Sequence, residues 1–401
     1  MKERELPEGW ECKRLGDVTL KFVNGGTPST AIPEYWNGSI PWTTSKSITS
    51  CTISAGEKFV SKEAVAKSST NVIPKDNILI ASRVGIGKSA VNVIDIAKSQ
   101  DLTGVILDKK EILPEFLVRY LHDPKIVKAL ESNARGSTIK GLQRSDLERI
   151  EISLPPLSVQ HQIVAVLERA EAVTRQRQEA DTLTGALLQS VFYEMFGNLV
   201  MNEKGWEIVK IRDVTEKSQY GCSVLGTNEG QYPILGMNNL TFEGKIDIKN
   251  LKYVNLSEKV FENFKLECGD ILFNRTNAPN LVGKTGLFQK GENFVFASYL
   301  IRLKLKMDIV DLEYLWTFLN SPYMKNKFSG MCKKAVNQAN INAQELQNIS
   351  IPLPPLALQQ QFAHVVQEVE GIREKQAESK KEIDTLFEGL MQRAFVGKLA
   401  V

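Results

Sequence analysis

The sequence contains few of the features that mark an enzyme, a disulfide-stabilised domain or a membrane protein. Its 401 residues include only three histidines and five cysteines. The cysteines are scattered and form no CxxC pair, so they fit neither a disulfide framework nor a zinc site. No run of about 18 apolar residues occurs, and the first residues, MKERELPEGW, do not resemble a signal peptide. We therefore expect a cytoplasmic protein with reduced thiols, no bound metal and no membrane segment.

The sequence also lacks a strong excess of either charge. Fifty Lys and Arg residues face 47 Asp and Glu residues, which gives a net charge of +3 and a pI of about 8.4. This balance is compatible with binding to nucleic acid but does not require it. The apolar fraction of 42% and the charged fraction of 24% are ordinary for a soluble protein. A chain of this length allows two or three domains.

Motifs for nucleotide binding and catalysis are incomplete. Gly87-Lys88-Ser89 and Gly283-Lys284-Thr285 look like the end of a phosphate-binding loop, but Ser82 and Ala278 stand where its first glycine is required. We interpret both segments as tight turns that present a lysine. Their recurrence after an arginine suggests contacts with a nucleic-acid backbone.

Catalytic groups do not recur in the two halves of the chain. The segment 277–280, NAPN, lacks the second proline and the aromatic residue of the amino-methyltransferase motif. The three histidines are far apart in sequence, and no Ser/His/Asp, Cys/His or paired-carboxylate pattern repeats. Because equivalent halves should share catalytic groups, we expect that this chain is not an enzyme.

Two long helices are predicted instead. The segment 154–197 begins with a double proline, which stops the preceding structure, and continues with apolar residues three and four positions apart. A helix from Ser158 to Phe196 would be about 58 Å long. A second copy occupies residues 353–397, where Pro354-Pro355-Leu356 repeats Pro155-Pro156-Leu157. We expect the apolar stripes of these helices to bury each other; their residues are Ile163, Val166, Ala170, Val173, Leu183, Leu187 and Val191, and Phe362, Val365, Val369, Ile372, Ile383, Leu386 and Leu390.

The repeat extends over the whole chain. Gly9-Trp10-Glu11 recurs 196 positions later at Gly205, Asp17-Val18-Thr19 recurs at Asp213, and Ile78-Leu79…Arg83 recurs as Ile271-Leu272…Arg275. The helices expected at 112–121 and 124–132 recur at 312–319 and 323–329. A period near 197 residues is too long for a solenoid. The pattern therefore predicts a duplicated mixed α/β domain, each copy followed by a long helix, in a pseudo-two-fold arrangement.

Polar loops recur between the matched framework segments. Lys and Arg attract phosphates, and Asn, Gln, Arg and Thr can bond base edges. We expect backbone contacts from residues in the repeated turns and loops: Arg83, Lys88, Arg135, Ser137, Thr138, Lys140, Arg275, Lys284, Lys334, Asn337, Gln338 and Asn340. We expect base contacts from loops that differ between the halves: Thr43, Thr44, Ser45, Lys46, Met237, Asn238 and Asn239.

Together these segments resemble the specificity subunit of type I restriction–modification systems. The resemblance rests on the two LPPL helices, on IPWTTSKSI, on the strand–turn segments DNILIASRVGIGK and GDILFNRTN, and on RGSTIKGL. It implies an α+β fold with two tandem target-recognition domains, at 1–153 and 201–352. It also implies two long antiparallel α-helices, at 154–200 and 353–401, which form a coiled coil.

The resemblance further implies the function and the partners. Each domain would recognise one half of a bipartite, asymmetric site in double-stranded DNA, and the helices would set the distance between the two halves. The helices would also dock two modification (methyltransferase) subunits, and we expect Gln160, Gln162, Gln359 and Gln361 to contribute there. S-adenosylmethionine would be bound by those subunits, and ATP and Mg by the motor and nuclease of the restriction subunits, with no cofactor on this chain.

Two other interpretations stay open at this stage. The chain could be a coiled-coil scaffold whose two domains bind proteins rather than DNA, which co-purification followed by DNA-binding measurements would distinguish. It could also be an enzyme with a cryptic site, which binding of S-adenosylmethionine or ATP by the chain alone would support.

Overall fold

The computed structural model describes residues 6–135, 141–278, 281–289, 291–331 and 339–399. The chain divides into two compact units, one formed by residues 1–178 with 378–401 and the other by residues 179–377. Each boundary falls inside one of the two long helices, α5 (Leu157–Phe196) and α10 (Leu356–Ala394), so every unit contains part of both. The predicted long helices are confirmed, and the first begins within one residue of its expected start.

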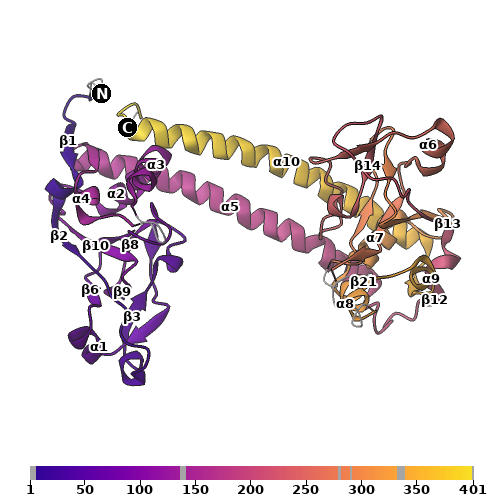
Figure 1. The fold of residues 1–401 in the computed structure, drawn as a ribbon, viewed down its shortest axis with the longest axis horizontal. Coiled ribbons are helices and arrows are strands. Elements are labelled where there is room, and N and C mark those ends of the chain that lie inside the picture. The colour runs from indigo at the N-terminus through magenta and orange to yellow at the C-terminus, as the bar shows by residue number, and fades with distance from the viewer. Residues whose placement is uncertain (1–5, 136–140, 279–280, 290, 332–338, 400–401) are drawn as a thin grey trace. The chain divides into compact units, whose positions relative to one another are not determined.

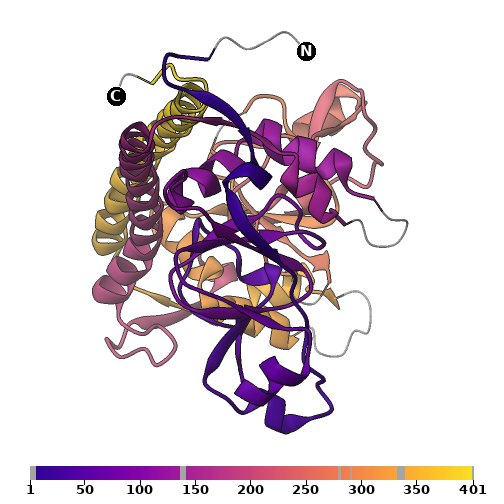
Figure 2. The same ribbon diagram turned by 90° about the vertical axis from the view of Figure 1, so that its left-hand side faces the viewer.

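The first unit is built on two sheets and a short two-stranded ribbon among the described residues (Figure 2). Their strand orders are β2-β10-β7-β8-β4, β5-β3-β9-β6 and β1-β11. The strand bounds are β1 Glu11–Arg14, β2 Thr19–Val23, β3 Ile40–Thr43, β4 Thr52–Ile53, β5 Lys58–Val60, β6 Asn71–Ile73, β7 Asn77–Ala81, β8 Ser89–Asn92, β9 Ile96–Lys98, β10 Leu102–Leu107 and β11 Glu151–Leu154. The helices that precede α5 are α1 Lys62–Lys67, α2 Pro114–Leu121, α3 Pro124–Asn133 and α4 Arg144–Glu148.

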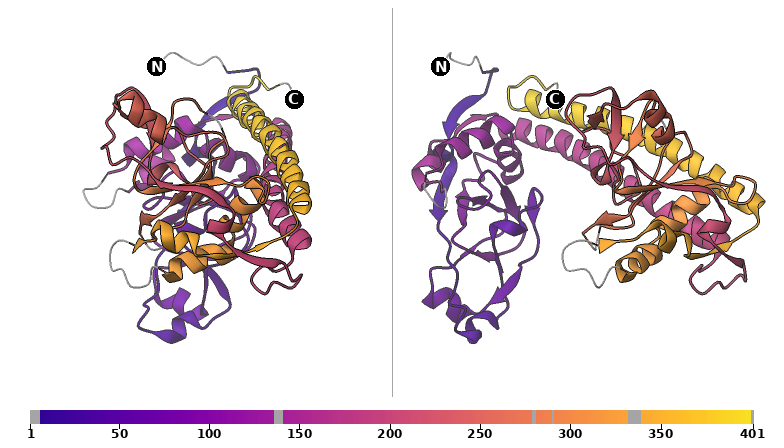
Figure 3. Two further views of the ribbon diagram at one scale, coloured as in Figure 1. Left: turned by 90° about the vertical axis from the view of Figure 1, so that its right-hand side faces the viewer. Right: turned by 45° about the vertical axis from the view of Figure 1, so that its right-hand side comes forward.

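The second unit repeats this topology (Figure 3). The orders β13-β20-β16-β18, β15-β14-β19 and β12-β22 correspond to β2-β10-β7-β8, β5-β3-β9 and β1-β11. The strand bounds are β12 Glu207–Lys210, β13 Thr215–Tyr220, β14 Tyr232–Leu235, β15 Lys252–Val254, β16 Ile271–Asn274, β17 Thr276–Asn277, β18 Thr285–Leu287, β19 Val295–Phe296, β20 Leu300–Leu305, β21 Ala339–Asn340 and β22 Ser350–Leu353. The helices that precede α10 are α6 Glu258–Phe264, α7 Leu312–Asn320, α8 Pro322–Met331 and α9 Ala343–Gln347. The internal duplication is therefore confirmed in the order of these strands. Among the described residues, β4 and β6 have no counterpart strand in the second unit, which has a further two-stranded sheet, β17-β21.

The main core of each unit is closed by the ends of both long helices. In the first unit, Ile163 and Leu167 from the start of α5 share one apolar cluster with Ala394 and Phe395 from the end of α10. In the second, Phe192 and Phe196 from the end of α5 pack on Phe362 from the start of α10, with ring centroids 5.2 and 5.5 Å apart. The start of one helix thus meets the end of the other in each unit, so the two helices run antiparallel.

The expected apolar seam between the helices is wrong in the second half of α5. Leu183 and Leu187 are 71% and 43% exposed, whereas Thr184 and Leu188, one position later, are buried. Three other expected seam residues are exposed, Val173, Ile372 and Leu386. Six more are only partly covered: Val166, Ala170, Val191, Val365, Ile383 and Leu390. Within the second unit, Thr184 accepts a hydrogen bond from the amide of Gln376 on α10 at 2.9 Å. The domain cores at the helix ends, rather than a continuous heptad, decide which face is buried.

A buried glutamine fastens each long helix to its domain. The side-chain oxygen of Gln160 accepts from the Leu113 N–H at 2.8 Å, and its amide donates to the carbonyls of Glu111 and Pro155 at 2.9 and 2.8 Å. Gln359 makes the same three kinds of contact, with the Asp311 N–H and the carbonyls of Ile309 and Pro354.

This geometry corrects the expectation that these glutamines dock a partner. Gln160 and Gln359 are fully buried and hydrogen-bonded inside their own domains. Only Gln162 and Gln361 are exposed.

At one pair of matching places, each domain buries a cation, but from different strands. In the first unit Lys98 on β9 lies beside Gly104 on β10, where a Cβ would come within 2.9 Å of the lysine Cε. In the second unit the equivalent residues are Phe296 and Arg302, and the guanidinium lies 5.1 Å from the phenyl centroid and donates to the Lys265 carbonyl at 2.7 Å. The space left by glycine in one copy is filled by arginine in the other.

We predict that replacing Gln160 with Leu will lower the free energy of unfolding by about 1–3 kcal/mol, because buried backbone groups at Leu113, Glu111 and Pro155 lose their partners. Chemical denaturation will measure the change, and Gln162→Leu, at an exposed position of the same helix, is the matched control. Unchanged stability of Gln160→Leu together with lost binding of a partner subunit would restore the docking role.

We also predict a pH dependence that originates at Lys98. Burial lowers the pKa of this lysine from 10.5 to about 7, and its ammonium has the Leu102 carbonyl as acceptor at 3.2 Å. Between those pH values the unfolded chain holds a proton that the folded chain has lost, so stability decreases as the pH falls from about 10.5 to about 7.

Replacing Lys98 with Met should therefore flatten the stability profile measured by denaturation between pH 7 and about 10. Lys46→Met, at an exposed position of the same domain, should leave the slope unchanged. Equal slopes in the wild type and Lys98→Met would show that Lys98 does not cause the effect.

Candidate nucleic-acid interface

The turn that follows β7 in the first domain presents two basic side chains. Gly85 and Gly87 have φ values of 73° and 92°, and a Cβ on Gly87 would lie 2.7 Å from Val127 on α3. Glycine is thus required by both backbone conformation and close packing. Arg83 and Lys88 are exposed on this turn. The turn leads into strand β8 rather than a helix, which fits the predicted tight turn and not a nucleotide-binding loop.

The equivalent turn in the second domain uses its lysine differently. Gly283 again has a left-handed φ of 87° and lies against Phe328 on α8. The ammonium of Lys284, however, donates to the Leu240 carbonyl at 2.8 Å and to the Met237 carbonyl at 3.4 Å, and burial lowers its pKa. This corrects the expected phosphate contact of Lys284, because its charge is held inside the domain and anchors the neighbouring loop.

The loops expected to contact bases are short 3-10 turns at equivalent places. Ser45–Ser47 follows β3, and Met237–Asn239 follows β14, whose register with β19 matches that of β3 with β9. In this register Lys46 corresponds to Asn238, and both are exposed. The two domains thus present different side chains from the same position of the same turn.

Several neighbours of these two residues are structural. Thr43 is fully buried and Ser45 is 2% exposed, so neither can reach a base edge. Thr44 donates its hydroxyl to Glu57. Asn239 is 8% exposed and closes its turn by accepting from the Gly236 N–H and donating to the Asp247 carbonyl, both at 2.9 Å. The expected base contacts of Thr43, Ser45 and Asn239 are therefore corrected, and Met237 is half-buried.

The third predicted element is the polar loop after α3 or α8. Its ends are fixed beside the strand–turn segments, because Leu142 donates to the Ser82 carbonyl at 2.7 Å and Ile341 donates to the Arg275 carbonyl at 2.9 Å. Arg135 is exposed and lies 3.7 Å from Asp146. The remaining expected contacts fall outside the described residues: Ser137, Thr138, Lys140, Lys334, Asn337 and Gln338.

Arg275 and Asn340 lie together at the second of these junctions. Strand β17 pairs with β21, and Thr276 donates its hydroxyl to the Asn340 side-chain oxygen at 3.2 Å. The guanidinium of Arg275 lies 4.8 Å from the ring centroid of Tyr220. Sequence reasoning missed Tyr220 and Tyr299, which are 42% and 46% exposed. No local pattern could have indicated them, because separate strands and loops bring them to this place.

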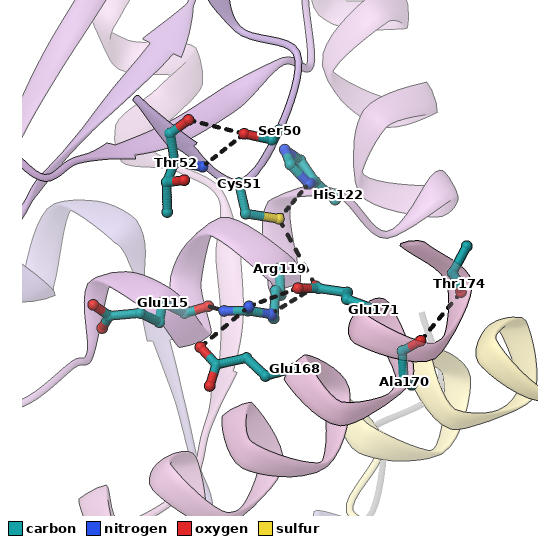
Figure 4. A network of polar contacts seen from close by, with 10 residues as sticks. All are labelled: Ser50, Cys51, Thr52, Glu115, Arg119, His122, Glu168, Ala170, Glu171 and Thr174. Carbon is teal, nitrogen blue, oxygen red and sulfur yellow. Dashed lines mark hydrogen bonds and ion pairs between the residues drawn. The ribbon is translucent and has the colours of Figure 1, made fainter. Parts of the chain in front are cut away.

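A Cys–His arrangement that the sequence did not predict lies where the segment before β4 meets the end of α2 and helix α5 (Figure 4). The thiol of Cys51 lies 3.6 Å from Nδ1 of His122 and 3.9 Å from the Glu171 carboxylate, and Arg119 forms a bidentate pair with Glu171 at 2.9 Å. Glu168 lies 3.4 Å from the same guanidinium. These residues line a cavity of about 770 Å³ in the first unit.

The chemistry of this cluster does not suit nucleophilic catalysis. Burial and the nearby Glu171 raise the pKa of the Cys51 thiol to about 11, and burial lowers the pKa of His122. A nucleophilic cysteine requires the opposite shift, toward a stable thiolate. The ion pair of Arg119 instead ties α2 to α5.

The described residues contain neither a metal-binding cluster nor a membrane-spanning helix. Within those ranges, no set of three or more His, Cys, Asp or Glu side chains could hold a metal ion. None of the helices formed by the same residues is long and apolar enough to cross a membrane.

Comparison with known proteins places this fold in a family. The model of the type I restriction modification DNA specificity domain matches residues 7–182 and again 203–385. The specificity subunit of the type I restriction enzyme MjaIX from Methanocaldococcus jannaschii is 24% identical, over 99% of this chain and 95% of its own. The EcoKI specificity subunit of Escherichia coli K12 is 23% identical, over 100% of this chain and 91% of its own.

A solved structure has the same fold. It comes from work on complex assembly and conformational transition in a type I restriction–modification system, and it superimposes with a TM-score of 0.65 at 21% identity, covering 98% of this chain and all of its own. With two matched domains and this shared fold, the chain belongs to the family of type I restriction–modification specificity subunits, whose general function is DNA sequence specificity.

Proposed function

We propose that this chain recognises a bipartite, asymmetric DNA site, one half with each domain, and directs methyltransferase and restriction subunits to it. The observation that carries the proposal is a repeated fold with different exposed side chains at the same turn position, Lys46 in one domain and Asn238 in the other. A lysine donates only, and suits the O6 and N7 acceptors of guanine, whereas an asparagine also accepts and suits adenine. Two such domains would recognise two different half-sites.

The long helices support a fixed distance between the half-sites. α5 has 40 residues and α10 has 39, so each is about 60 Å long. Both are continuous helices whose ends are built into the domain cores. A rigid helix pair can hold two reading domains at a set separation and rotation along the duplex, which a flexible linker cannot do.

Exposed apolar side chains on the same helices support docking of the methyltransferase subunits. Leu183, Leu187 and Ile372 are 71%, 43% and 46% exposed in the second unit, and Leu386 is 64% exposed in the first. Leu183 and Leu187 are one helical turn apart on α5, and adjoining apolar side chains on a polar surface mark protein contacts. The partner subunits would bind S-adenosylmethionine, ATP and Mg²⁺ and carry out the reactions, while this chain supplies specificity.

The alternative is a scaffold whose domains bind proteins. The exposed side chains at the repeated turns and loops favour DNA, because they are basic or amide-bearing in both domains: Arg83, Lys88, Arg135, Lys46, Asn238 and Asn340. Such groups supply phosphate attraction and base recognition.

The test is methylation by the complex that this chain forms with methyltransferase subunits encoded by neighbouring reading frames. Methylome sequencing of a host that expresses the complex should show a motif in two defined parts separated by a nonspecific spacer. Lys46→Ala should relax the sequence requirement of one part and Asn238→Ala that of the other, each by about 1–3 kcal/mol of discrimination. Glu262→Ala, at an exposed position of α6, is the control.

Co-purification of the subunits without any new methylation or DNA binding would favour the scaffold instead. If both alanine variants changed the same half of the motif, the assignment of one half-site to each domain would be wrong.

A second prediction concerns the spacer. Deleting Glu378–Lys381 shortens α10 by about 6 Å and rotates its remainder by about 40°. We expect the methylated motif to keep both half-sites and to change the spacer between them by about two base pairs, at 3.4 Å each.

Replacing the same four residues with alanine keeps the helix length and should leave the spacer unchanged. An unaltered spacer in the deletion variant would contradict a measuring role for α10.

A further inference from the structure

We propose that the second domain holds one phosphate of the DNA backbone in a small polar pocket centred on Arg275, and that the first domain has no counterpart of this pocket. The inference rests on the proposed function and specifies the ligand of one of its contact sites. The pocket has a volume of about 390 Å³ and is lined by Arg275, Thr276, Ser298, Tyr299 and Asn340.

Arg275 is held in place but has few acceptors. Its guanidinium stacks on Tyr220, whose hydroxyl accepts the Ala343 N–H at 2.8 Å and so fixes the ring. One terminal nitrogen donates to the Ser298 carbonyl over a long 3.4 Å, and the buried Nε has no acceptor among the described residues. An arginine has five N–H donors, and a buried donor without a partner is costly. The position therefore favours an acceptor from outside the chain.

The other lining groups suit an anion. Thr276 donates its hydroxyl to the Asn340 side-chain oxygen, which leaves the amide N–H groups of Asn340 as donors. None of the described residues that line the pocket carries a carboxylate. A planar, positively charged fork beside neutral donors is the arrangement that binds phosphate, with two parallel hydrogen bonds to its oxygens.

The strand register shows what the first domain has at this place. Asn274 pairs with Leu300 as Ala81 pairs with Leu102, so the residue that corresponds to Arg275 is Ser82. The backbone agrees, because Arg275 donates to the Tyr299 carbonyl as Ser82 donates to that of Asp101. Arg83 is one position further on, which corrects the alignment of Arg83 with Arg275 made from sequence.

The chemistry of the first domain opposes an anion there. Ser82 is only 6% exposed, and its hydroxyl accepts from that of Thr103 at 3.1 Å. Asp101 stands where the second domain has Tyr299, and it would place a negative charge beside a bound phosphate. The two domains thus hold the DNA backbone by different means at equivalent points of the fold.

The experiment scans single phosphates. Duplexes that contain the cognate site carry one neutral methylphosphonate at each position in turn, and the assembled complex with its methyltransferase subunits is titrated with each. For the wild type we expect neutralisation to weaken binding at several positions, and at the position held by Arg275, in one half-site, by on the order of tenfold. Arg275→Ala should weaken binding to unmodified DNA by a similar factor and lower the slope of log affinity against log salt concentration by about one. Neutralising the phosphate at that position should then have no further effect on binding.

Two variants provide controls. Arg275→Lys keeps the charge but loses the fork and should bind with intermediate affinity, and a thermal melt of both Arg275 variants separates a lost contact from a lost fold. Arg83→Ala removes an exposed arginine from the first domain, and it should keep the wild-type pattern in the affected half-site.

The outcomes separate the pocket from the proposed function. If Arg275→Ala keeps the wild-type scan, with the same positions still sensitive, the pocket does not hold a DNA phosphate although the chain binds DNA. Inorganic phosphate could raise the melting temperature of the wild type but not of Arg275→Ala, while no position in the scan depends on Arg275. This result would indicate a site for free anions and would overturn the proposal. Absence of duplex binding by the wild-type complex would refute the proposed function itself.

Discussion

The structure depends on the way both long helices take part in the core of each domain. Ile163 and Leu167 of α5 lie in one apolar cluster with Phe395 beyond α10, and Phe192 of α5 lies in another with Phe362 of α10. Burying a large apolar side chain contributes about 1.5–3 kcal/mol, so pulling a helix end away would expose several such groups at once. Each buried glutamine adds a polar restraint. Gln160 forms hydrogen bonds with backbone groups of the loop before α2, and Gln359 does so with the loop before α7. Helix position and domain structure are therefore coupled in both units.

The duplication shows which features a common fold requires and which it allows to change. The strand orders, the glycine turns and the glutamine anchors occur in both domains. The buried cation is Lys98 on β9, beside Gly104, in one copy and Arg302 on β20, over Phe296, in the other. Arg302 has a hydrogen-bonded and aromatic environment, whereas Lys98 has a single carbonyl and a lowered pKa. The two copies thus surround their buried cations with different partners within one topology.

The same divergence occurs at the surface, and it fits a specificity subunit. Equivalent 3-10 turns present lysine in one domain and asparagine in the other, and equivalent strand ends carry serine and arginine. Cys51, which lies near His122, has a raised pKa and borders the ion-pair network that joins α2 to α5. These surface differences lie at positions that the proposed function assigns to DNA contact.

Sequence alone determined the features that local periodicity and repetition encode. The two long helices, the pairs α2–α3 and α7–α8, the duplicated order of elements and the tight glycine turns all follow from apolar spacing, proline positions and matched segments. Tertiary structure decided which side of each element is buried. Period 3.6 identifies a helix, yet the choice between Leu187 and Leu188 as the buried residue depends on the domain core it meets. Likewise, Gln160 and Lys284 look like surface groups in sequence, but carbonyls from distant segments surround them, and the true counterpart of Arg275 became visible only from strand register. These assignments rest on contacts between residues far apart in the chain, which one sequence without a fold does not specify.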